Sequence, residues 1–446
     1  MTLRLVSQLF QPVLTIPKNA KIKNTEITCK SQKLLLECGL VRPTASGLFT
    51  LLPLARRALD KLERLIISCI EETGAQRMSF PSLTTTGLWE KTGRLQAGGS
   101  ELMQVEDRHG KKYLLSPTHE EAVADLLADI GHLSYKQLPI ILYQIGAKYR
   151  DEHRPKHGLL RAREFRMLDA YGAHADEACA RAAYRRLRHA YRKLFDALHL
   201  PVRSVVAPSG EMGGSLSHEW QLPVPEGAGE DTLEICASCS HAALPSGEER
   251  ACEQCGGRTE RVPSIEVGHT FVLGTKYSAP LGANYVPSSG PPSPLLMSCY
   301  GIGITRLLAA GLEALSSDSC LRWPRGLAPY SVLVVGPAER SKAWSECGWE
   351  RALHVSRSLA ALPRLGGDVL VDDRHHLSVG KRLLMADRMG YPTVVVCGRA
   401  ALESPPRYEL LQAGAGPAPR LLTHEQLLHE LAGDAEEDNN IPLVAT

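Results

Sequence analysis

Apolar residues recur three and four positions apart in two long stretches of the chain, which predicts helices with one buried face. The first helix is expected over 53–72, and Gly74 behind it is a common stop signal. The second is expected over 176–198, where five arginines share one side. We interpret these arginines as a solvated face, with contact to a nucleic acid as the alternative. The predicted buried faces consist of Leu54, Ala58, Leu62, Leu65 and Ile66 in the first helix and of Ala178, Ala182, Leu187 and Leu194 in the second.

Shorter elements are expected between these helices. A helix over 117–130 has Ser116 or Thr118 in place to cap its N-terminus. A strand over 78–81 ends at a proline, and a core strand is expected over 140–149.

The C-terminal part has a different pattern. Short β-branched runs lie at 331–336, 368–372 and 393–398, with helical stretches between them. Strands that alternate with helices favour a mostly parallel sheet.

Composition limits the class of protein and its location. The chain has 446 residues, enough for about three domains. Its 51 Lys and Arg against 49 Asp and Glu leave a net charge of +2, so contact with nucleic acid would need local basic patches. No uncharged apolar run reaches about 18 residues, which argues against a membrane span. Eight of the 12 cysteines are scattered singly, which favours a reducing compartment.

The two ends of the chain have biased composition. The N-terminal stretch is basic and contains no acid before Glu26. This pattern is typical of transit peptides, and a frayed terminus is the alternative. Residues 433–446 form an acidic tail that we expect to be disordered.

Four cysteines are spaced as in a zinc ribbon. Cys236-x-x-Cys239 is followed after 12 residues by Cys252-x-x-Cys255, and Gly256 permits a tight turn. The segment is too short to bury a sizeable core, so a structural zinc ion would supply its folding free energy. Two disulfides or four free thiols are the alternatives.

Arginines, an aromatic residue and a distant glycine-rich turn form the pattern of a triphosphate site. Between 147 and 166 there are seven Lys or Arg and two His against three acids. The planar guanidinium of arginine grips phosphate oxygens in bidentate fashion. Each arginine alone is most simply a surface ion pair, but both segments in this order favour a phosphate site. The segments are Tyr149-Arg150-Asp151-Glu152, then Arg161-Ala162-Arg163-Glu164-Phe165, and far downstream Gly301-Ile302-Gly303-Ile304-Thr305-Arg306.

These segments resemble motifs 2 and 3 of class II aminoacyl-tRNA synthetases. From about 28 to 430 the chain is similar to the prolyl-tRNA synthetase family, in particular to its mitochondrial type. The resemblance implies an α+β catalytic core, with an antiparallel sheet flanked by helices, and a C-terminal α/β anticodon-binding domain. It also implies that 53–81 is motif 1, which forms the interface of a homodimer. An ordinary helix–strand pair is the alternative for 53–81.

The resemblance assigns roles in the ATP site. Arg150 would bind the α-phosphate of ATP and the amino-acid carboxylate, and Arg306 would hold the γ-phosphate; these two arginines are the expected catalytic residues. Phe165 would stack on adenine, and Glu152 would face the adenine end or the ATP-bound metal. Arg161 belongs to the same ATP-binding set. Mg²⁺ is implied with ATP, because a triphosphate needs neutralisation beyond the arginines.

A proline-binding set is implied as well. Thr118 and Glu120 would receive the cationic amine of L-proline, because a buried carboxylate needs a partner. A helix N-terminus with early acids explains these residues equally well. Cys299 would lie beside the proline ring, or is simply a small buried cysteine. The full set is Thr118, Glu120, Arg150, Asp169, His174 and Cys299.

The chain departs from the family pattern at three positions. Ala173 stands where an aromatic residue is usual, Leu168 where lysine is usual and Trp220 where phenylalanine is usual. The first change puts the packing of the proline pocket in doubt and leaves the phosphate site untouched.

The resemblance also concerns tRNA(Pro). Arg154 would meet its acceptor end, and Arg374, Lys381 or Arg382 would touch the anticodon.

Bacterial relatives have a large editing domain between motifs 2 and 3, where this chain has only about 40 residues. A pocket for proline excludes alanine poorly, since a methylene group or two is worth about 1–3 kcal/mol. We therefore expect weak discrimination against alanine and no hydrolysis of Ala-tRNA(Pro) in cis.

The expected protein ligates L-proline to tRNA(Pro) through a prolyl-adenylate in the mitochondrial matrix. A relative specific for threonine, serine or glycine, or a binding subunit without catalysis, is the alternative. The expected domains are a targeting or disordered N-terminus (1–27), the catalytic core (28–223 and 264–326), the four-cysteine insert (224–263), the anticodon-binding domain (327–432) and the tail (433–446).

Overall fold

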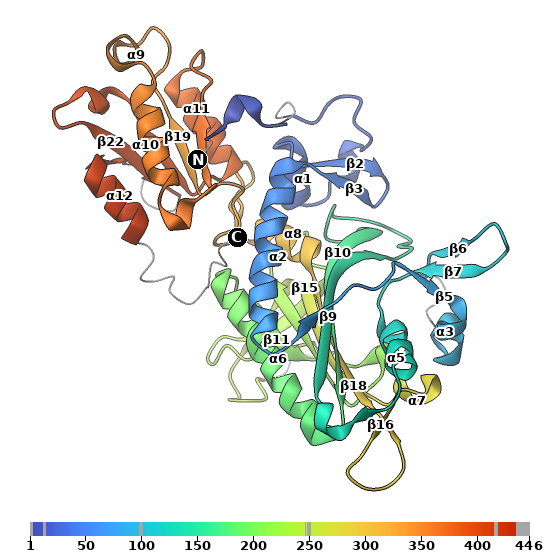
Figure 1. The fold of residues 1–446 in the computed structure, drawn as a ribbon. Coiled ribbons are helices and arrows are strands. Elements are labelled where there is room, and N and C mark those ends of the chain that lie inside the picture. The colour runs from blue at the N-terminus through green and yellow to red at the C-terminus, as the bar shows by residue number, and fades with distance from the viewer. Residues whose placement is uncertain are drawn as a thin grey trace.

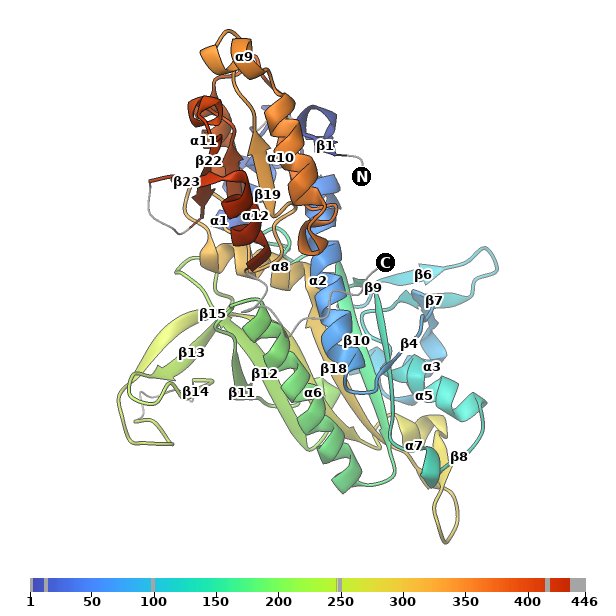
Figure 2. The ribbon, with the colours of Figure 1, turned by 60° about the vertical axis from the view of Figure 1, so that its left-hand side comes forward.

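The computed structural model describes residues 3–11, 15–97, 101–245, 247, 251–413 and 418–433. Figures 1 and 2 show two bodies, a larger one built on a long antiparallel sheet and a smaller one built on strands and helices of the C-terminal part. The predicted acidic tail lies outside the described residues apart from Gly433. No helix in the described ranges is both long and apolar enough to cross a membrane.

A nine-stranded sheet forms the centre of the larger body. Its long strands pair antiparallel, as the sequence predicts for the catalytic core, and only the short β4 joins in parallel. The order across the sheet is β11 (Arg203–Val206), β12 (Leu216–Pro223), β15 (Thr259–Gly274), β18 (Leu296–Gly303), β10 (Glu164–His174), β9 (Ile140–Tyr149) and β4 (Gln76–Arg77).

Three helices cover one face of this sheet (Figure 2). They are α2 (Pro53–Glu71), α6 (Glu177–Ala197) and α8 (Ile304–Leu315), and α1 (Lys30–Glu37) packs on α8. The helix predicted over 53–72 is confirmed as α2, with Leu54, Ala58, Leu62 and Ile66 in the core. Burial of such a stripe, at about 25 cal/mol per Å², is what stabilises the helix on the sheet.

The predicted face of α6 is wrong in part. The helix itself is confirmed, and Asp176 caps it by accepting a hydrogen bond from the backbone N–H of Cys179 at 2.7 Å. Ala178, however, is exposed, because the helix turns toward the sheet the face that carries its aromatic side chains. The residues buried on α6 are Ala180, Ala183, Tyr184, Leu187, Ala190, Tyr191, Leu194 and Phe195.

Two other predicted boundaries shift. The helix expected over 117–130 is α5 (Glu120–Asp129), and its N-cap is His119, so neither Ser116 nor Thr118 caps it. The strand expected over 78–81 is found two residues earlier as β4. Residue 81 is the proline that bounds this segment, and a proline disfavours helix before it without fixing where a strand stops.

Small elements cover the opposite face of the sheet. A three-stranded sheet of β5 (Leu83–Thr85), β7 (Lys112–Leu115) and β6 (Gln104–Glu106) lies beside the helices α3 (Thr86–Lys91), α4 (Arg94–Ala97), α5 and α7 (Ser278–Leu281) (Figure 1). Two further groups are the hairpin β2 (Val41–Ala45) and β3 (Leu48–Leu51), and the sheet of β8 (Leu133–Ser134), β16 (Asn284–Val286) and β17 (Ser293–Pro294).

The C-terminal body is the predicted alternation of strands and helices. Its three β-branched runs form the parallel strands β19 (Val332–Val335), β20 (Val369–Asp372) and β21 (Thr393–Val396), and β22 (Arg407–Gln412) and β23 (Arg420–Thr423) continue the sheet antiparallel. The helices are α9 (Lys342–Cys347), α10 (Glu350–Ala360), α11 (Val379–Met389) and α12 (His424–Gly433).

The N-terminal stretch, expected to be a targeting or disordered segment, lies on this C-terminal body. Its strand β1 (Arg4–Leu5) pairs in parallel with β20, and the backbone N–H of Ser7 donates to the carboxylate of Asp373 at 2.9 Å. Ile16, Ile22 and Ile27 then pack against the main core. The described residues of this stretch thus contact both bodies.

The cysteine insert is an extension of the central sheet rather than a separate unit. Its strand β13 (Asp231–Cys236) pairs with the first half of β15 and with the short β14 (Ala242–Ala243). Because β15 continues without a break into the sheet, the insert and the core share one strand.

Candidate active site

A cavity of about 420 Å³ opens on the face of the central sheet that carries the small elements. Eight of the residues predicted from the sequence line it: Thr118, Glu120, Arg150, Glu152, Phe165, Asp169, Cys299 and Arg306. Residues separated by nearly 200 positions therefore meet, because β9, β10 and β18 lie side by side.

One end of the cavity is cationic. Arg150 follows the end of β9, and its guanidinium lies 5.1 Å from the ring centre of Phe165. Arg306, in the first turn of α8, donates from Nε to the carbonyl oxygen of Leu160 at 2.7 Å. Burial and the charge of Arg306 lower the pKa of Arg150. Within the described ranges no side chain forms a hydrogen bond or ion pair with Arg150, so this end can accept an anion.

An acidic group lies beside these arginines. Ligand atoms of Glu219, Glu266 and His269 come within 4.8 Å of one another, and Glu266 and His269 line the cavity. Burial opposes ionisation of Glu266, but His269, Arg306 and Arg150 outweigh burial and lower its pKa. Two neighbouring carboxylates beside these arginines offer the oxygen ligands that suit a hard divalent cation such as Mg²⁺.

The opposite end is anionic. Arg94 Nη1 lies 3.4 Å from Glu120, 3.1 Å from Glu121 and 3.4 Å from the hydroxyl of Thr118. Arg94 also lies over the ring of Trp89, with its guanidinium carbon 4.5 Å from the ring centre. The carboxylate of Glu120 therefore already has one partner in the protein, and a substrate amine would be a second one.

Two carboxylates still face one guanidinium at this end. Burial raises the pKa of Glu121, and Arg94 opposes that effect. The local charge remains negative when both acids are ionised, so a cationic amine would be attracted here.

Asp169 anchors a buried polar network between the two ends. Its carboxylate accepts hydrogen bonds from Lys148 at 2.6 Å, from Gln144 at 3.0 Å and from the Tyr171 hydroxyl at 2.8 Å. Burial opposes its ionisation, but His119 and Lys148 outweigh burial and lower its pKa. Asp169 lines the cavity as predicted, with its charge matched by a lysine that is fully buried.

Cys299 lies on the apolar wall of the cavity, in one cluster with Tyr171, Ala173 and Phe271. Burial raises the pKa of its thiol well above the usual value, so the group is a neutral thiol at neutral pH.

His174 lies away from the cavity. Side chains alternate along a strand, so His174 points to the face of β10 opposite that of Asp169 and Ala173. There its Nε2 is 2.8 Å from the Ser298 hydroxyl and its Nδ1 is 3.7 Å from the Cys179 sulfur on α6. The structure thus places His174 among core groups and not with the pocket residues.

The remaining predicted residues are distributed outside the cavity. Arg161 donates from Nε to Glu152 at 2.7 Å and so borders the cavity, and Arg154 is exposed on the same loop. In the C-terminal body Lys381 is exposed, while Arg374 forms a bidentate pair with Asp372 at 2.9 and 2.6 Å.

Arg382 is fully buried, which differs from the expected contact with RNA. Its guanidinium donates to the backbone oxygens of Asp372 at 3.2 Å and Gly336 at 2.8 Å. A side chain in this position holds two loops of the sheet together and presents no surface to a partner.

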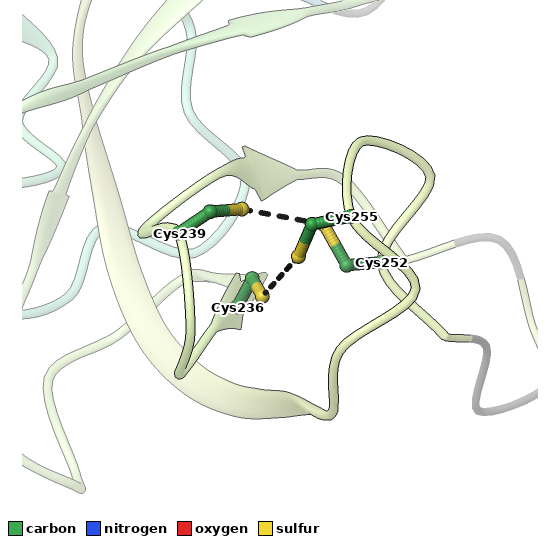
Figure 3. A group of neighbouring side chains, drawn as sticks. All are labelled: Cys236, Cys239, Cys252 and Cys255. Atoms are coloured by element: carbon green, nitrogen blue, oxygen red, sulfur yellow. Dashed lines mark hydrogen bonds between the residues drawn. The ribbon is translucent and has the colours of Figure 1, made fainter.

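The four cysteines converge (Figure 3). Their sulfur atoms lie within 4.8 Å of one another, with 3.5 Å between Cys236 and Cys255 and 3.6 Å between Cys239 and Cys252. Backbone groups of Cys239 and Ser238 lower the pKa of Cys236 to about 6, so its thiolate is available at neutral pH. Four converging sulfurs of this kind fit tetrahedral zinc.

Sequence reasoning missed several residues of the site. Arg94, Glu121 and Lys148 give no local signal, because each becomes informative only beside its partner from another element. Glu219 and Glu266 lie on two neighbouring strands, and only their register brings them together. The spacing of two carboxylates on paired strands cannot be read from a sequence before the pairing is known.

Comparisons with known proteins agree with this geometry. Residues 103–315 match the tRNA synthetase class II core domain (G, H, P, S and T). The chain is 42% identical to the "probable proline–tRNA ligase, mitochondrial" of Rattus norvegicus, over 96% of this chain and 90% of that protein. It is 44% identical to the protein of the same description from Homo sapiens, over 91% of this chain and 86% of that protein.

A bacterial relative and a solved structure extend the comparison. The "proline–tRNA ligase" of Sulfurimonas denitrificans is 34% identical, over 85% of this chain and 90% of that protein. The fold is similar to that of Giardia lamblia prolyl-tRNA synthetase in complex with prolyl-adenylate, with a TM-score of 0.75 and 18% identity over 92% of this chain and 80% of that one. The chain therefore belongs to the prolyl-tRNA synthetase family of class II aminoacyl-tRNA synthetases and resembles its mitochondrial members.

Proposed function

We propose that this protein joins L-proline to tRNA(Pro) through a prolyl-adenylate, as a homodimer in the mitochondrial matrix. The observation on which the proposal rests is a single cavity with a cationic end at Arg150 and Arg306 and an anionic end at Glu120 and Glu121. An amino acid between these ends has its carboxylate near the arginines and its amine near the acids. The names of the mitochondrial relatives support the substrate and the compartment.

In the first step, an oxygen of the proline carboxylate attacks the α-phosphorus of ATP, and pyrophosphate leaves. Both reactants are anionic, so the protein must offset their repulsion and align them. Arg150 would contact both groups, since it lies at the cationic end of the cavity and forms no hydrogen bond or ion pair with a described side chain. Arg306 would hold the γ-phosphate, Phe165 would stack on adenine, and Arg161 would orient Glu152.

Mg²⁺ would be held with the triphosphate by Glu219 and Glu266, whose carboxylates adjoin the arginines. A bound cation would neutralise charge on the leaving pyrophosphate. Zinc would occupy the four-cysteine cluster as a structural ion. Its thiolate ligands and short loops match a tetrahedral site.

The cavity wall that contains Cys299, Tyr171 and Phe271 would select the amino acid by its size. Thr118 and Glu120 would face the secondary amine of proline, and Asp169 would keep this wall in place through Lys148. Alanine would enter the same space, since it lacks only part of the ring.

In the second step, the prolyl group passes to the terminal ribose of tRNA(Pro), and AMP leaves. Arg154 is exposed on the loop beside the cavity, where it could meet the acceptor end. Lys381 and the partly exposed Arg374 would face the anticodon. The segment between the motifs, 224–263, forms strands β13, β14 and the start of β15, and we assign it no hydrolytic activity toward Ala-tRNA(Pro).

Charging of a mitochondrial tRNA(Pro) transcript tests this proposal. We expect labelled proline to be transferred, labelled alanine to be transferred more slowly, and Ala-tRNA(Pro) to persist in the presence of the enzyme. No transfer of proline would contradict the activity, and rapid deacylation of Ala-tRNA(Pro) by the enzyme alone would contradict only the absence of editing.

A further inference from the structure

An acidic residue of the cysteine insert reaches the phosphate-binding arginines. Glu230 immediately precedes β13, and its carboxylate lies 3.6 Å from Nη2 of Arg306 and 3.9 Å from Nη1 of Arg161. The side chain is 13% exposed. Neither motif that marks the ATP site contains Glu230, so the insert contributes this charge from outside them.

The Glu230 carboxylate is held only partly. Its Oε1 is buried and forms no hydrogen bond with any described residue. A buried carboxylate oxygen without a donor costs free energy, and ion pairs of 3.6 and 3.9 Å are long for direct contact. The Glu230 carboxylate thus offsets the charge of the two arginines but leaves most of their N–H donors free. A phosphate group could therefore displace this carboxylate.

The backbone connects this carboxylate to the cysteine cluster. Strand β13 begins next to Glu230 and ends at Cys236, which is about 17 Å of extended chain. Its register on β15 pairs Asp231 with Ser264 and Cys236 with Thr259. The same strand β15 continues to Glu266 and His269 at the cavity.

A second contact ties the start of β13 to the acidic group of the site. Gln221 donates to Asp231 at 3.1 Å and to Glu219 at 2.9 Å. The position of Glu230 is therefore fixed on one side by the sheet and on the other by the cluster at the far end of β13.

We propose that Glu230 is an anionic stand-in for phosphate, which the cysteine insert holds against Arg306 and Arg161 and which ATP must displace. This inference rests on the proposed function, since it concerns the ATP site of the same enzyme. It gives the insert a role in ATP affinity: an intact cluster keeps β13, and with it Glu230, in the competing position. Glu230 thus competes with the phosphates of ATP for these arginines and does not take part in the reaction.

Glu230→Gln tests the competition, because it removes the charge and keeps the shape. We expect the KM for ATP in proline-dependent pyrophosphate exchange to fall about three- to tenfold, with kcat and the KM for proline within about twofold of wild type. Calorimetric titration of ATP with Mg²⁺ in the absence of proline should show the same gain in affinity.

Glu234→Gln is the matched control. Glu234 lies on the same strand and pairs with Arg261 at 3.0 Å, within the insert and away from the cavity. We expect the ATP affinity of this variant to equal that of wild type. An ATP affinity of Glu230→Gln that is unchanged, or weaker than that of Glu234→Gln, would overturn the inference.

The role of the cluster is tested with Cys255→Ser, whose metal content is measured by release to a chromogenic chelator. We expect it to bind ATP more tightly by a similar factor and to show no further gain when combined with Glu230→Gln. If the two substitutions raised ATP affinity independently, so that their factors multiplied in the double variant, the link between the cluster and the carboxylate would be refuted. Absence of exchange in the wild type would contradict the proposed function instead, and the calorimetric comparison would still decide the role of Glu230.

Discussion

At the scale of the residue, the site contains charged side chains that are not fully paired with opposite charges in the protein. Arg150 forms no hydrogen bond or ion pair with a described side chain, and Glu120 and Glu121 share one guanidinium. Such groups are stabilised when a ligand of opposite charge binds. A zwitterion with its carboxylate toward Arg150 and its amine toward Glu120 satisfies both ends at once.

The buried histidine His174 gives a prediction for pH. Burial, reinforced by Arg186, lowers its pKa to about 4, whereas in the unfolded chain it titrates near 6.5. Above pH 6.5 both states are neutral and stability is unaffected. Between about 6.5 and 4 only the unfolded state gains the proton, so stability falls as pH falls, by at most about 3 kcal/mol.

Thermal unfolding of wild type and His174→Gln across this pH range measures the effect. We expect the variant to lose part of the acid sensitivity, so that its stability relative to wild type is higher at pH 5 than at pH 8. Equal slopes of stability against pH in the two proteins would contradict the assignment. His218, whose pKa burial also lowers to about 4, contributes to the slope that remains.

Sequence patterns predicted the residues of the site unevenly. The arginines Arg150 and Arg306 follow from motifs with fixed chemistry, and both line the cavity. The resemblance assigns both Asp169 and His174 to the pocket wall, but an odd separation of five residues along one strand puts their side chains on opposite faces. Arg382 follows Lys381 in a basic pair, yet one residue of helix rotation separates an exposed side chain from a buried one.

At the scale of the element, α2 joins the two bodies through one carboxylate. Asp368, just before β20, lies 2.7 Å from Lys61 and 2.8 Å from Arg57, both on α2. Burial opposes its ionisation, but Lys61 outweighs burial and lowers its pKa. Its stabilising effect is therefore full above about pH 4 and is lost in more acidic solution as the carboxylate is protonated.

Replacement of this carboxylate should loosen the contact. We expect Asp368→Asn to lower the free energy of unfolding by about 2–4 kcal/mol, because the largely buried Lys61 then keeps the carbonyl oxygen of Ala328 but loses its charged partner. Asp60→Asn is the control, since Asp60 forms an exposed pair with Arg56 on the same helix and should cost under about 1 kcal/mol. Denaturant unfolding at pH 7 compares them, and equal losses would show that Asp368 does not join the bodies.

The cysteine insert gives a prediction about metal. We expect purified protein to contain about one zinc ion per chain. Chelation should speed amide hydrogen exchange in β13 and β14 more than in β9 or β10, because the insert has only a small apolar cluster at Leu233 and Ala242 to hold it when the ion is removed. Zinc-free protein with four intact thiols and unchanged exchange would refute a structural metal.

Helix positions were predicted better than helix phases. The stretch 53–72 has large aliphatic residues at helical spacing, so both the range and the buried face of α2 follow. In α6 alanine occurs on every side, and the buried stripe depends on Tyr184, Tyr191 and Phe195 instead. Alanine is a strong helix former with little apolar area, so it indicates a helix without indicating its face.

At the scale of the whole molecule, the arrangement of the sheets depends on pairings between strands that are far apart in the sequence, which local sequence patterns do not predict. The first residues of the chain complete the sheet of the C-terminal body through β1 and β20, although more than 360 positions separate them. The insert, expected as a domain of its own, shares β15 with the catalytic core. Local patterns identify strands, whereas register and partner depend on tertiary contacts.

The most direct test of the account is amino-acid-dependent exchange of labelled pyrophosphate into ATP, with proline compared against alanine, threonine, serine and glycine. We predict strong exchange with proline, weak exchange with alanine, and a loss of at least about 100-fold in Arg150→Ala, because we propose that this arginine contacts both reacting groups. Exchange with another amino acid in preference to proline, or exchange that survives in Arg150→Ala, would contradict the account.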